Sequence, residues 1–251
     1  MKSTKLQLYI TGFGPFKTIK ENPSAAIGTA VALQMAEDCT LSVHYEELAV
    51  ELNAVSTYFT KLEETLSQQM DHNSDNERIL LVHVGVHSTE TNGEMRLEVC
   101  GYNELEGKPI DVSKPMDVCL ESAFIRNKSN LTTTTVGAGA TITLIEELNA
   151  AIKSLVATED EEGMNGNNNN DNNNVESKRP HWIISRDAGR YYCNYALYRS
   201  LKLQERWNGR VFAVFVHVVV PYMCGNPSLE EQTLQVRSLV SGLVHILNEK
   251  T

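Results

Sequence analysis

Two long apolar runs constrain the fold of this chain more than any other feature of its sequence. One spans Arg78 to Val86 (Arg-Ile-Leu-Leu-Val-His-Val-Gly-Val), and the other spans Val211 to Val220 (Val-Phe-Ala-Val-Phe-Val-His-Val-Val-Val). Both have the length of a strand, and neither alternates polar with apolar residues. Continuous apolar runs of this length are typical of strands that are covered on both faces. We therefore expect a central sheet between two layers of helices.

Shorter elements alternate with these two strands. Further strands are predicted at Lys5 to Thr11, at Leu41 to His44 and at Trp182 to Ile184. Helices are predicted after the N-cap sequence Asn22-Pro23-Ser24, at Leu52 to Leu66, at Ile142 to Leu155, close to Cys193, and after the capping box Ser228-Leu229-Glu230-Glu231. The polar stretch from Ser67 to Glu77 is expected to be a loop, and His87 to Val136 to be irregular. The alternation predicts an α/β fold, a single three-layer α/β/α sandwich with a mostly parallel, partly mixed central sheet.

The length and composition are compatible with one sizeable domain. The chain has 251 residues, of which 41% are hydrophobic, so residues 1–251 are expected to form a single domain. Residues 159–178 include a run of asparagines, Asn167 to Asn170, and have almost no apolar content. We expect this segment to be a disordered insertion at the surface.

Charge and cysteine usage exclude several classes of function. The formal net charge is −10 and no basic cluster occurs, so neither nucleic acid nor an anionic membrane is an expected partner. No run approaches the roughly 20 apolar residues of a membrane span, and no secretory signal is recognisable. The five cysteines lack CxxC spacing, which predicts neither disulfides nor a metal site. The expected location is the cytoplasm, and no cofactor is expected.

Cys193 is the first candidate for chemistry. It follows a short strand and a turn rich in Asp and Gly, close to a predicted helix start. The helix dipole and the unpaired N–H groups at such a position favour a thiolate. A structural interpretation stays open, because Cys193, Leu197 and Leu201 are spaced four apart and could share a buried helix face.

A cysteine hydrolase also needs an imidazole and often a third group that orients it. His217 lies towards the carboxyl end of its strand, where the working groups of such sheets gather. If the strand before Cys193 is its neighbour, the two side chains come within reach of each other. Glu98 is the candidate for the third group. From chemistry alone His83 is as good a candidate as His217, and either could be a core histidine.

Four segments together resemble the motifs of pyroglutamyl peptidase I, the cysteine peptidase family that removes an N-terminal pyroglutamyl residue from peptides. They occur in the family's order: Thr11-Gly12-Phe13-Gly14-Pro15-Phe16 with Asn22-Pro23-Ser24, then Leu97-Glu98-Val99-Cys100-Gly101-Tyr102-Asn103, then Ser185-Arg186-Asp187-Ala188-Gly189-Arg190-Tyr191-Tyr192-Cys193-Asn194, then Phe215-Val216-His217-Val218 with Pro221. The resemblance spans most of the chain outside its polar insertions.

The resemblance implies a cysteine exopeptidase, or omega peptidase, that acts through a thioacyl-enzyme intermediate on N-terminally pyroglutamylated peptides. It implies that Cys193 is the nucleophile, that His217 is the general base and then the general acid, and that Glu98 orients His217. Phe13 and Phe16 match the aromatic pair that flanks the lactam ring. From the sequence alone, these rings could equally fold back onto the core.

Two alternatives differ from this function. The first is a related hydrolase that acts on another cyclic amide. The second is a non-catalytic module that binds a small molecule, with Gly12-Phe13-Gly14 around a nucleotide phosphate ahead of a helix. That loop lacks the third glycine of GxGxxG and the lysine of a Walker motif.

Overall fold

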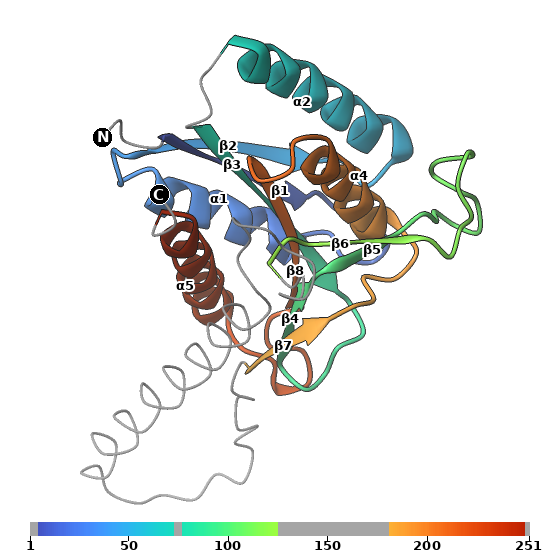
Figure 1. The fold of residues 1–251 in the computed structure, drawn as a ribbon. Helices are drawn as coiled ribbons and strands as arrows, with labels where there is room; N and C mark the ends of the chain where they lie inside the picture. The colour runs from blue at the N-terminus through green and yellow to red at the C-terminus, as the bar shows by residue number, and fades with distance from the viewer. Residues whose placement is uncertain (1–4, 73–76, 125–180, 249–251) are drawn as a thin grey trace, which may run out of the picture.

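The computed structural model describes residues 5–72, 77–124 and 181–248. The predicted helix at Ile142 to Leu155 and the asparagine-rich segment at 159–178 lie outside the described residues. Figure 1 shows a central sheet with helices packed on it.

A six-stranded sheet forms the middle layer, in the order β2-β1-β3-β8-β4-β7. All neighbours pair in parallel except β4 and β8, which are antiparallel. The prediction of a mostly parallel, partly mixed sheet is therefore confirmed. The strands are β1 (Lys5–Phe13), β2 (Leu41–Leu48), β3 (Glu77–His87), β4 (Glu94–Glu98), β7 (His181–Ser185) and β8 (Val211–Val219).

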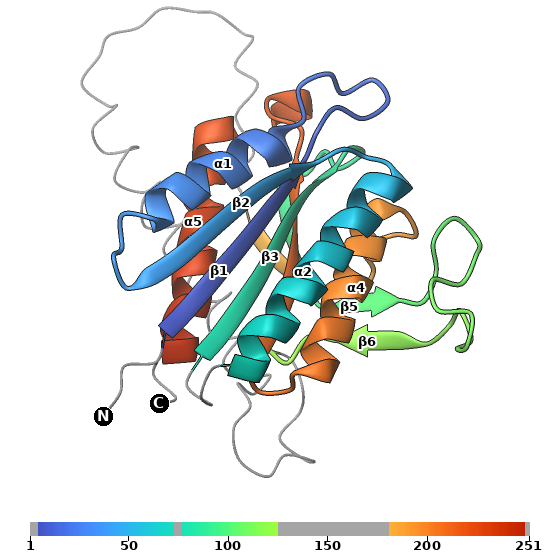
Figure 2. The ribbon, with the colours of Figure 1, turned by 90° about the horizontal axis from the view of Figure 1, so that it is seen from above.

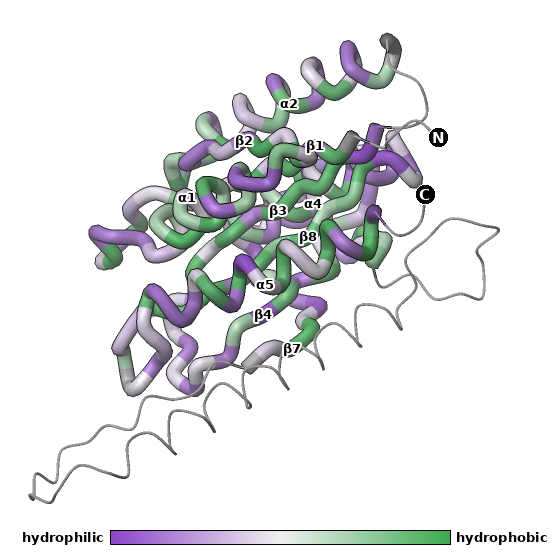
Figure 3. Tube along the Cα trace, turned by 90° about the vertical axis from the view of Figure 1, so that its left-hand side faces the viewer, coloured by the Kyte–Doolittle hydropathy of each residue, from purple (hydrophilic) through white to green (hydrophobic). Residues whose placement is uncertain are grey.

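Helices cover both faces of this sheet, as predicted. Helices α1 (Pro23–Met35) and α5 (Leu229–Asn248) lie on one face, and α2 (Leu52–His72) and α4 (Tyr192–Arg206) lie on the other (Figure 2). Every residue of β8 is buried, and the central strands are the hydrophobic interior of the molecule (Figure 3). No helix in the described ranges is long and apolar enough to cross a membrane.

Local signals in the sequence account for the helix starts. The Asn22 side chain accepts a hydrogen bond of 3.1 Å from the backbone N–H of Ser24, so α1 begins at Pro23 as expected. Ser228 and Glu231 exchange hydrogen bonds at the start of α5, which confirms the capping box. A short 3-10 helix, η3 (Met223–Gly225), precedes this start.

Two predicted loops were partly wrong. Helix α2 continues to His72 instead of ending near Leu66, because Gln68, Gln69 and Met70 are good helix formers. The segment after His87, expected to be irregular, contributes β4 and a hairpin of β5 (Cys100–Tyr102) and β6 (Cys119–Glu121). Strands this short carry too few residues for a recognisable hydrophobic period.

Candidate active site

Cys193 lies in the first turn of α4, which begins at Tyr192. Leu197 and Leu201 are completely buried in the core on this face of the sheet, whereas Cys193 is only partly buried. The two leucines therefore anchor the helix, as the structural interpretation expected. The thiol lies beyond them at the helix start, where the N–H groups of the first turn favour negative charge.

The Cys193 sulfur lies over Gly85 of β3. A Cβ atom at Gly85 would be only 3.1 Å from Cys193 Sγ and 2.5 Å from the Phe215 ring. Position 85 therefore needs glycine to leave room for the thiol and the ring. Gly85 pairs with His217 in the ladder between β3 and β8. The structure thus brings Cys193 and His217 together, close enough for the thiol to raise the pKa of the imidazole.

The route by which these two side chains meet differs from the prediction. The strand that precedes Cys193 is β7, and β4 separates it from β8, so the two strands are not neighbours. The chain instead leaves β7, and α4 crosses back over β3 and β8. The helix start, and not strand adjacency, therefore carries the thiol to the imidazole.

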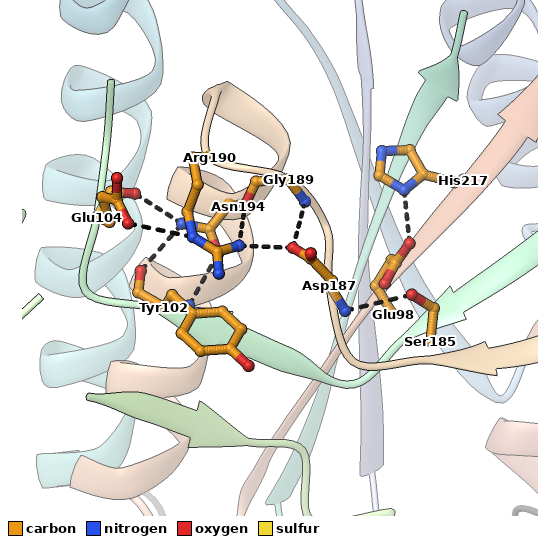
Figure 4. Close-up of polar contacts among 9 residues, drawn as sticks. All are labelled: Glu98, Tyr102, Glu104, Ser185, Asp187, Gly189, Arg190, Asn194 and His217. Carbon is orange, nitrogen blue, oxygen red and sulfur yellow. Dashed lines mark hydrogen bonds and ion pairs between the residues drawn. The ribbon is translucent and has the colours of Figure 1, made fainter. Parts of the chain in front are cut away.

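Glu98 and His217 form a buried pair. Nδ1 of His217 lies 2.8 Å from Oε1 of Glu98, and the two residues are 4% and 0% exposed (Figure 4). Oε2 of Glu98 has no hydrogen-bond partner among the described residues. Burial by itself lowers the pKa of His217, but Cys193 and Glu98 outweigh it and raise that pKa to about 9. The arrangement therefore favours an imidazolium that lies between two acidic side chains.

His83, which chemistry alone could not separate from His217, has a different environment. Its Nδ1 lies 2.7 Å from Thr11 Oγ1, and its Nε2 lies 3.0 Å from Ser200 Oγ. Ser200 Oγ donates to the carbonyl of Ala196, so the ring donates to Ser200 and accepts from Thr11. Burial lowers the pKa of His83 to about 3. His83 is thus a neutral core histidine with both nitrogens occupied.

An apolar pocket adjoins the thiol. Phe13, Phe16 and Cys193 all line it. Phe13 is 3% exposed and its ring centroid is 6.2 Å from that of Phe215, so it also packs on the core, whereas Phe16 is half-exposed. The remaining wall residues, which sequence reasoning did not select for this pocket, are Asn22, Val50, Val86, Tyr191 and Tyr192.

Polar contacts hold the segment that leads into α4 (Figure 4). Arg190 lies 2.5 Å from Asp187 and 3.2 Å from Glu104, and its guanidinium stacks on the Tyr102 ring at 4.0 Å. The Asn194 side chain bonds both the N–H and the carbonyl of Tyr102. Arg190 and Asn194 flank Cys193 in the sequence motif, which is the signal that could have identified them as residues that fix the nucleophile.

The other described cysteines lie outside this arrangement. Cys39 is exposed, Cys119 is partly buried and Cys100 is buried. Burial raises the pKa of the Cys100 thiol to about 12. Among the described residues, no group of three or more His, Cys, Asp or Glu side chains lies together as a set of metal ligands.

Comparison with known proteins gives the fold. No family model matches the sequence, and no curated protein matches it. A mutant pyrrolidone carboxyl peptidase from the hyperthermophile Pyrococcus furiosus has a similar structure, with a TM-score of 0.62 and 18% identity over 96% of this chain and 99% of that chain. Pyroglutamyl peptidase I of Bacillus amyloliquefaciens has a TM-score of 0.58 and 16% identity over 96% and 98%. The pyrrolidone carboxyl peptidase of Fervidobacterium islandicum has a TM-score of 0.55 and 20% identity over 96% and 99%. The chain has the fold of the pyrrolidone carboxyl peptidases.

Proposed function

We propose that this protein is a cysteine exopeptidase that hydrolyses the bond after an N-terminal pyroglutamyl residue. The observation that carries the proposal is the position of His217, which is hydrogen-bonded to Glu98 and lies close to Cys193, beside a pocket that contains Phe13 and Phe16. Solved structures of the same fold are named pyrrolidone carboxyl peptidase and pyroglutamyl peptidase I, which supports the same substrate class. Residues 1–251 would act as one catalytic domain in the reducing cytoplasm.

The first half of the reaction is acyl transfer to sulfur. The Cys193 thiolate attacks the carbonyl carbon of the pyroglutamyl residue, and a tetrahedral intermediate forms. Because Glu98 occupies Nδ1 of His217, Nε2 is the nitrogen that is left for the reacting groups. His217 gives its proton to the leaving nitrogen as the C–N bond breaks. The products are a thioester on Cys193 and a peptide shortened by one residue.

The second half is hydrolysis of the thioester. Neutral His217 now takes a proton from water, and the oxygen of that water attacks the thioester carbonyl. The C–S bond breaks and pyroglutamate leaves, while the proton on His217 restores the starting pair. Glu98 stabilises the charged form of the ring in each half and fixes its orientation. The backbone N–H of Cys193, in the first turn of α4, is the donor that we propose for the oxyanion.

The pocket suits the pyroglutamyl group. A lactam is flat and neutral, with apolar ring faces and polar amide edges, so aromatic side chains can hold its faces. A free N-terminal glutamate would bring a charged amine and a carboxylate into an apolar slot, where burial of unpaired charge is costly. The same wall therefore binds the cyclic residue and excludes its open form.

The test is the release of a fluorogenic amine from its pyroglutamyl conjugate by the purified protein under reducing conditions. We expect turnover by the wild type and none by Cys193→Ala or Cys193→Ser, with circular dichroism showing that both variants fold. Prolyl and acetylated conjugates of the same amine are the matched controls. Turnover of these controls at the rate of the pyroglutamyl conjugate would contradict the substrate assignment.

A further inference from the structure

The order of the strands determines on which side of the thiol each part of the substrate lies. In the strand order, β1 lies on one side of β3 and β8 lies on the other. Phe13 of the pocket belongs to β1, His217 belongs to β8, and the thiol lies over Gly85 between them. If pyroglutamate is the acyl group, its ring lies towards Phe13 and the leaving nitrogen lies towards His217. The rest of the peptide must therefore leave the site past β8 and the end of β3.

His87 is the side chain at that place. Residues two apart on a strand share a face, so His87 lies on the same face as Gly85, one step further towards the carboxyl end of β3. It pairs with Val219, which lies two residues after His217 along β8 and on the same face. The rings of His87 and His217 meet edge to face, with centroids 5.7 Å apart.

The environment of His87 suits a binding role better than a structural one. The residue is half-buried, and its Nδ1 is buried without a hydrogen-bond partner among the described residues, whereas no hydrogen bond within those residues occupies its Nε2. His83 on the same strand face differs, because it has a partner on each ring nitrogen. Because the buried Nδ1 is out of reach of a ligand, Nε2 is the nitrogen that His87 can offer to one.

The charged groups around His87 keep it neutral. Its own burial lowers the pKa of His87 first, and Arg96 and His217 lower it further, against smaller opposing effects of Glu90 and Glu98. Arg96 pairs with His217 in the ladder and lies 3.0 Å from Glu90. A neutral imidazole offers one donor and one acceptor, as a peptide backbone does, and does not repel the imidazolium of His217.

We propose that His87 binds the substrate on the leaving-group side, by hydrogen-bonding the backbone of the residue that follows pyroglutamate. The inference rests on the proposed function, because that function determines which side is occupied by the leaving peptide. His87 would then bind peptides, which have a backbone after the scissile bond, better than simple pyroglutamyl amides, which have none. Glu98 and Arg96, on β4, frame this side of the site but are engaged with other partners.

The test compares two substrates, a pyroglutamyl arylamide and a pyroglutamyl tripeptide amide, and measures kcat and KM for each. The variants are His87→Phe, which keeps a ring but not the hydrogen bonds, and His87→Gln, which keeps a donor and an acceptor. His44→Phe is the matched control, since His44 is an exposed histidine on β2, at the other edge of the sheet from β4. Melting temperatures are recorded for all variants.

For His87→Phe we expect the ratio of kcat/KM for the peptide to kcat/KM for the arylamide to fall by about threefold to tenfold, the worth of one hydrogen bond. The loss should be mainly in KM. His87→Gln should recover much of the ratio, and His44→Phe should keep it at the wild-type value. An unchanged ratio in His87→Phe, or equal losses on both substrates, would overturn the inference. A wild type that turns over neither substrate would instead reject the proposed function, and the inference with it.

Discussion

Nδ1 of His217 lies 2.8 Å from Oε1 of Glu98, and this hydrogen bond joins two side chains that are almost fully removed from solvent. The bond determines which ring nitrogen is left for the thiol, and together with Cys193 it raises the pKa of the ring. Several properties of the site can be measured through this pair.

Replacement of Glu98 with Gln should lower kcat and move the alkaline limb of the pH profile. The wild-type pKa of His217 is raised to about 9, so the imidazolium that protonates the leaving amine persists up to that pH. Glu98→Gln removes one cause of the raised pKa, and the limb should therefore move to lower pH. We expect kcat to fall by at least about tenfold, since the ring also loses its orientation. A pH profile of kcat/KM for both proteins checks this, and superimposable limbs would contradict it.

The same raised pKa predicts how stability depends on pH. A histidine whose pKa is higher in the folded than in the unfolded state stabilises the fold fully below about pH 6.5, and this stabilisation is lost as pH rises through about 9. The melting temperature of the wild type should therefore decline between pH 7 and pH 10 more steeply than that of His217→Gln. Parallel declines in the two proteins would show that His217 does not have the raised pKa.

A paired replacement separates the two buried histidines. His217→Gln should reduce kcat by about 100-fold to 10,000-fold, the usual contribution of a general acid and base. His83→Gln should lose stability through its contacts with Thr11 and Ser200 but retain most of its turnover at temperatures where it is folded. Steady-state kinetics and thermal unfolding of both variants check this. A complete loss of turnover in folded His83→Gln would contradict the assignment.

Alkylation should select Cys193 over a more exposed thiol. Cys39 is exposed and Cys193 is only partly buried, so access alone would favour Cys39. Because Cys193 lies beside the His217 imidazolium, we expect iodoacetamide to modify Cys193 before Cys39. Peptide mapping over a time course measures both rates. In His217→Gln the preference should disappear, and a preference that survives there would mean that His217 does not activate the thiol.

Gly85→Ala tests whether the thiol lies over β3. The new methyl group would be 2.5 Å from the Phe215 ring and 3.1 Å from Cys193 Sγ, so both must shift. We expect a loss of roughly 1 to 3 kcal/mol in stability, as for overpacked cores, together with a fall in kcat that exceeds the rise in KM. Unfolding in denaturant and steady-state kinetics provide the two readouts. Normal kcat in a destabilised variant would place the sulfur elsewhere.

The two phenylalanines should give different results. Phe13 is 3% exposed and packs on the core as well as lining the pocket, so Phe13→Leu should lower both the melting temperature and kcat/KM. Phe16 is half-exposed, so Phe16→Ala should raise KM for pyroglutamyl substrates with little change in melting temperature. Kinetics and thermal unfolding of both variants check this, and unchanged KM in Phe16→Ala would remove that ring from the binding site.

Recognition of the site from sequence depended on local motifs in combination. The sequence predicted correctly that Asn22 caps α1 and that Cys193 lies at the start of α4. Both signals lie within a few neighbouring residues. The choice between His83 and His217 was not predictable from the chemistry of either residue, since both lie in buried strands. It depends on Thr11 and Ser200, which are 72 and 117 positions away from His83 in the chain.

The sequence by itself determined the α/β class, the buried strands and the starts of helices α1, α4 and α5. Hydrophobic period and capping are properties of neighbouring residues, so they can be read from the sequence. Only the tertiary structure decided that β4 separates β7 from β8, that the thiol reaches His217 across Gly85, and that His87 lies beside the leaving-group side. Strand order and register join segments that are far apart in the chain, and a one-residue change of register would turn Glu98 or His217 to the opposite face of the sheet.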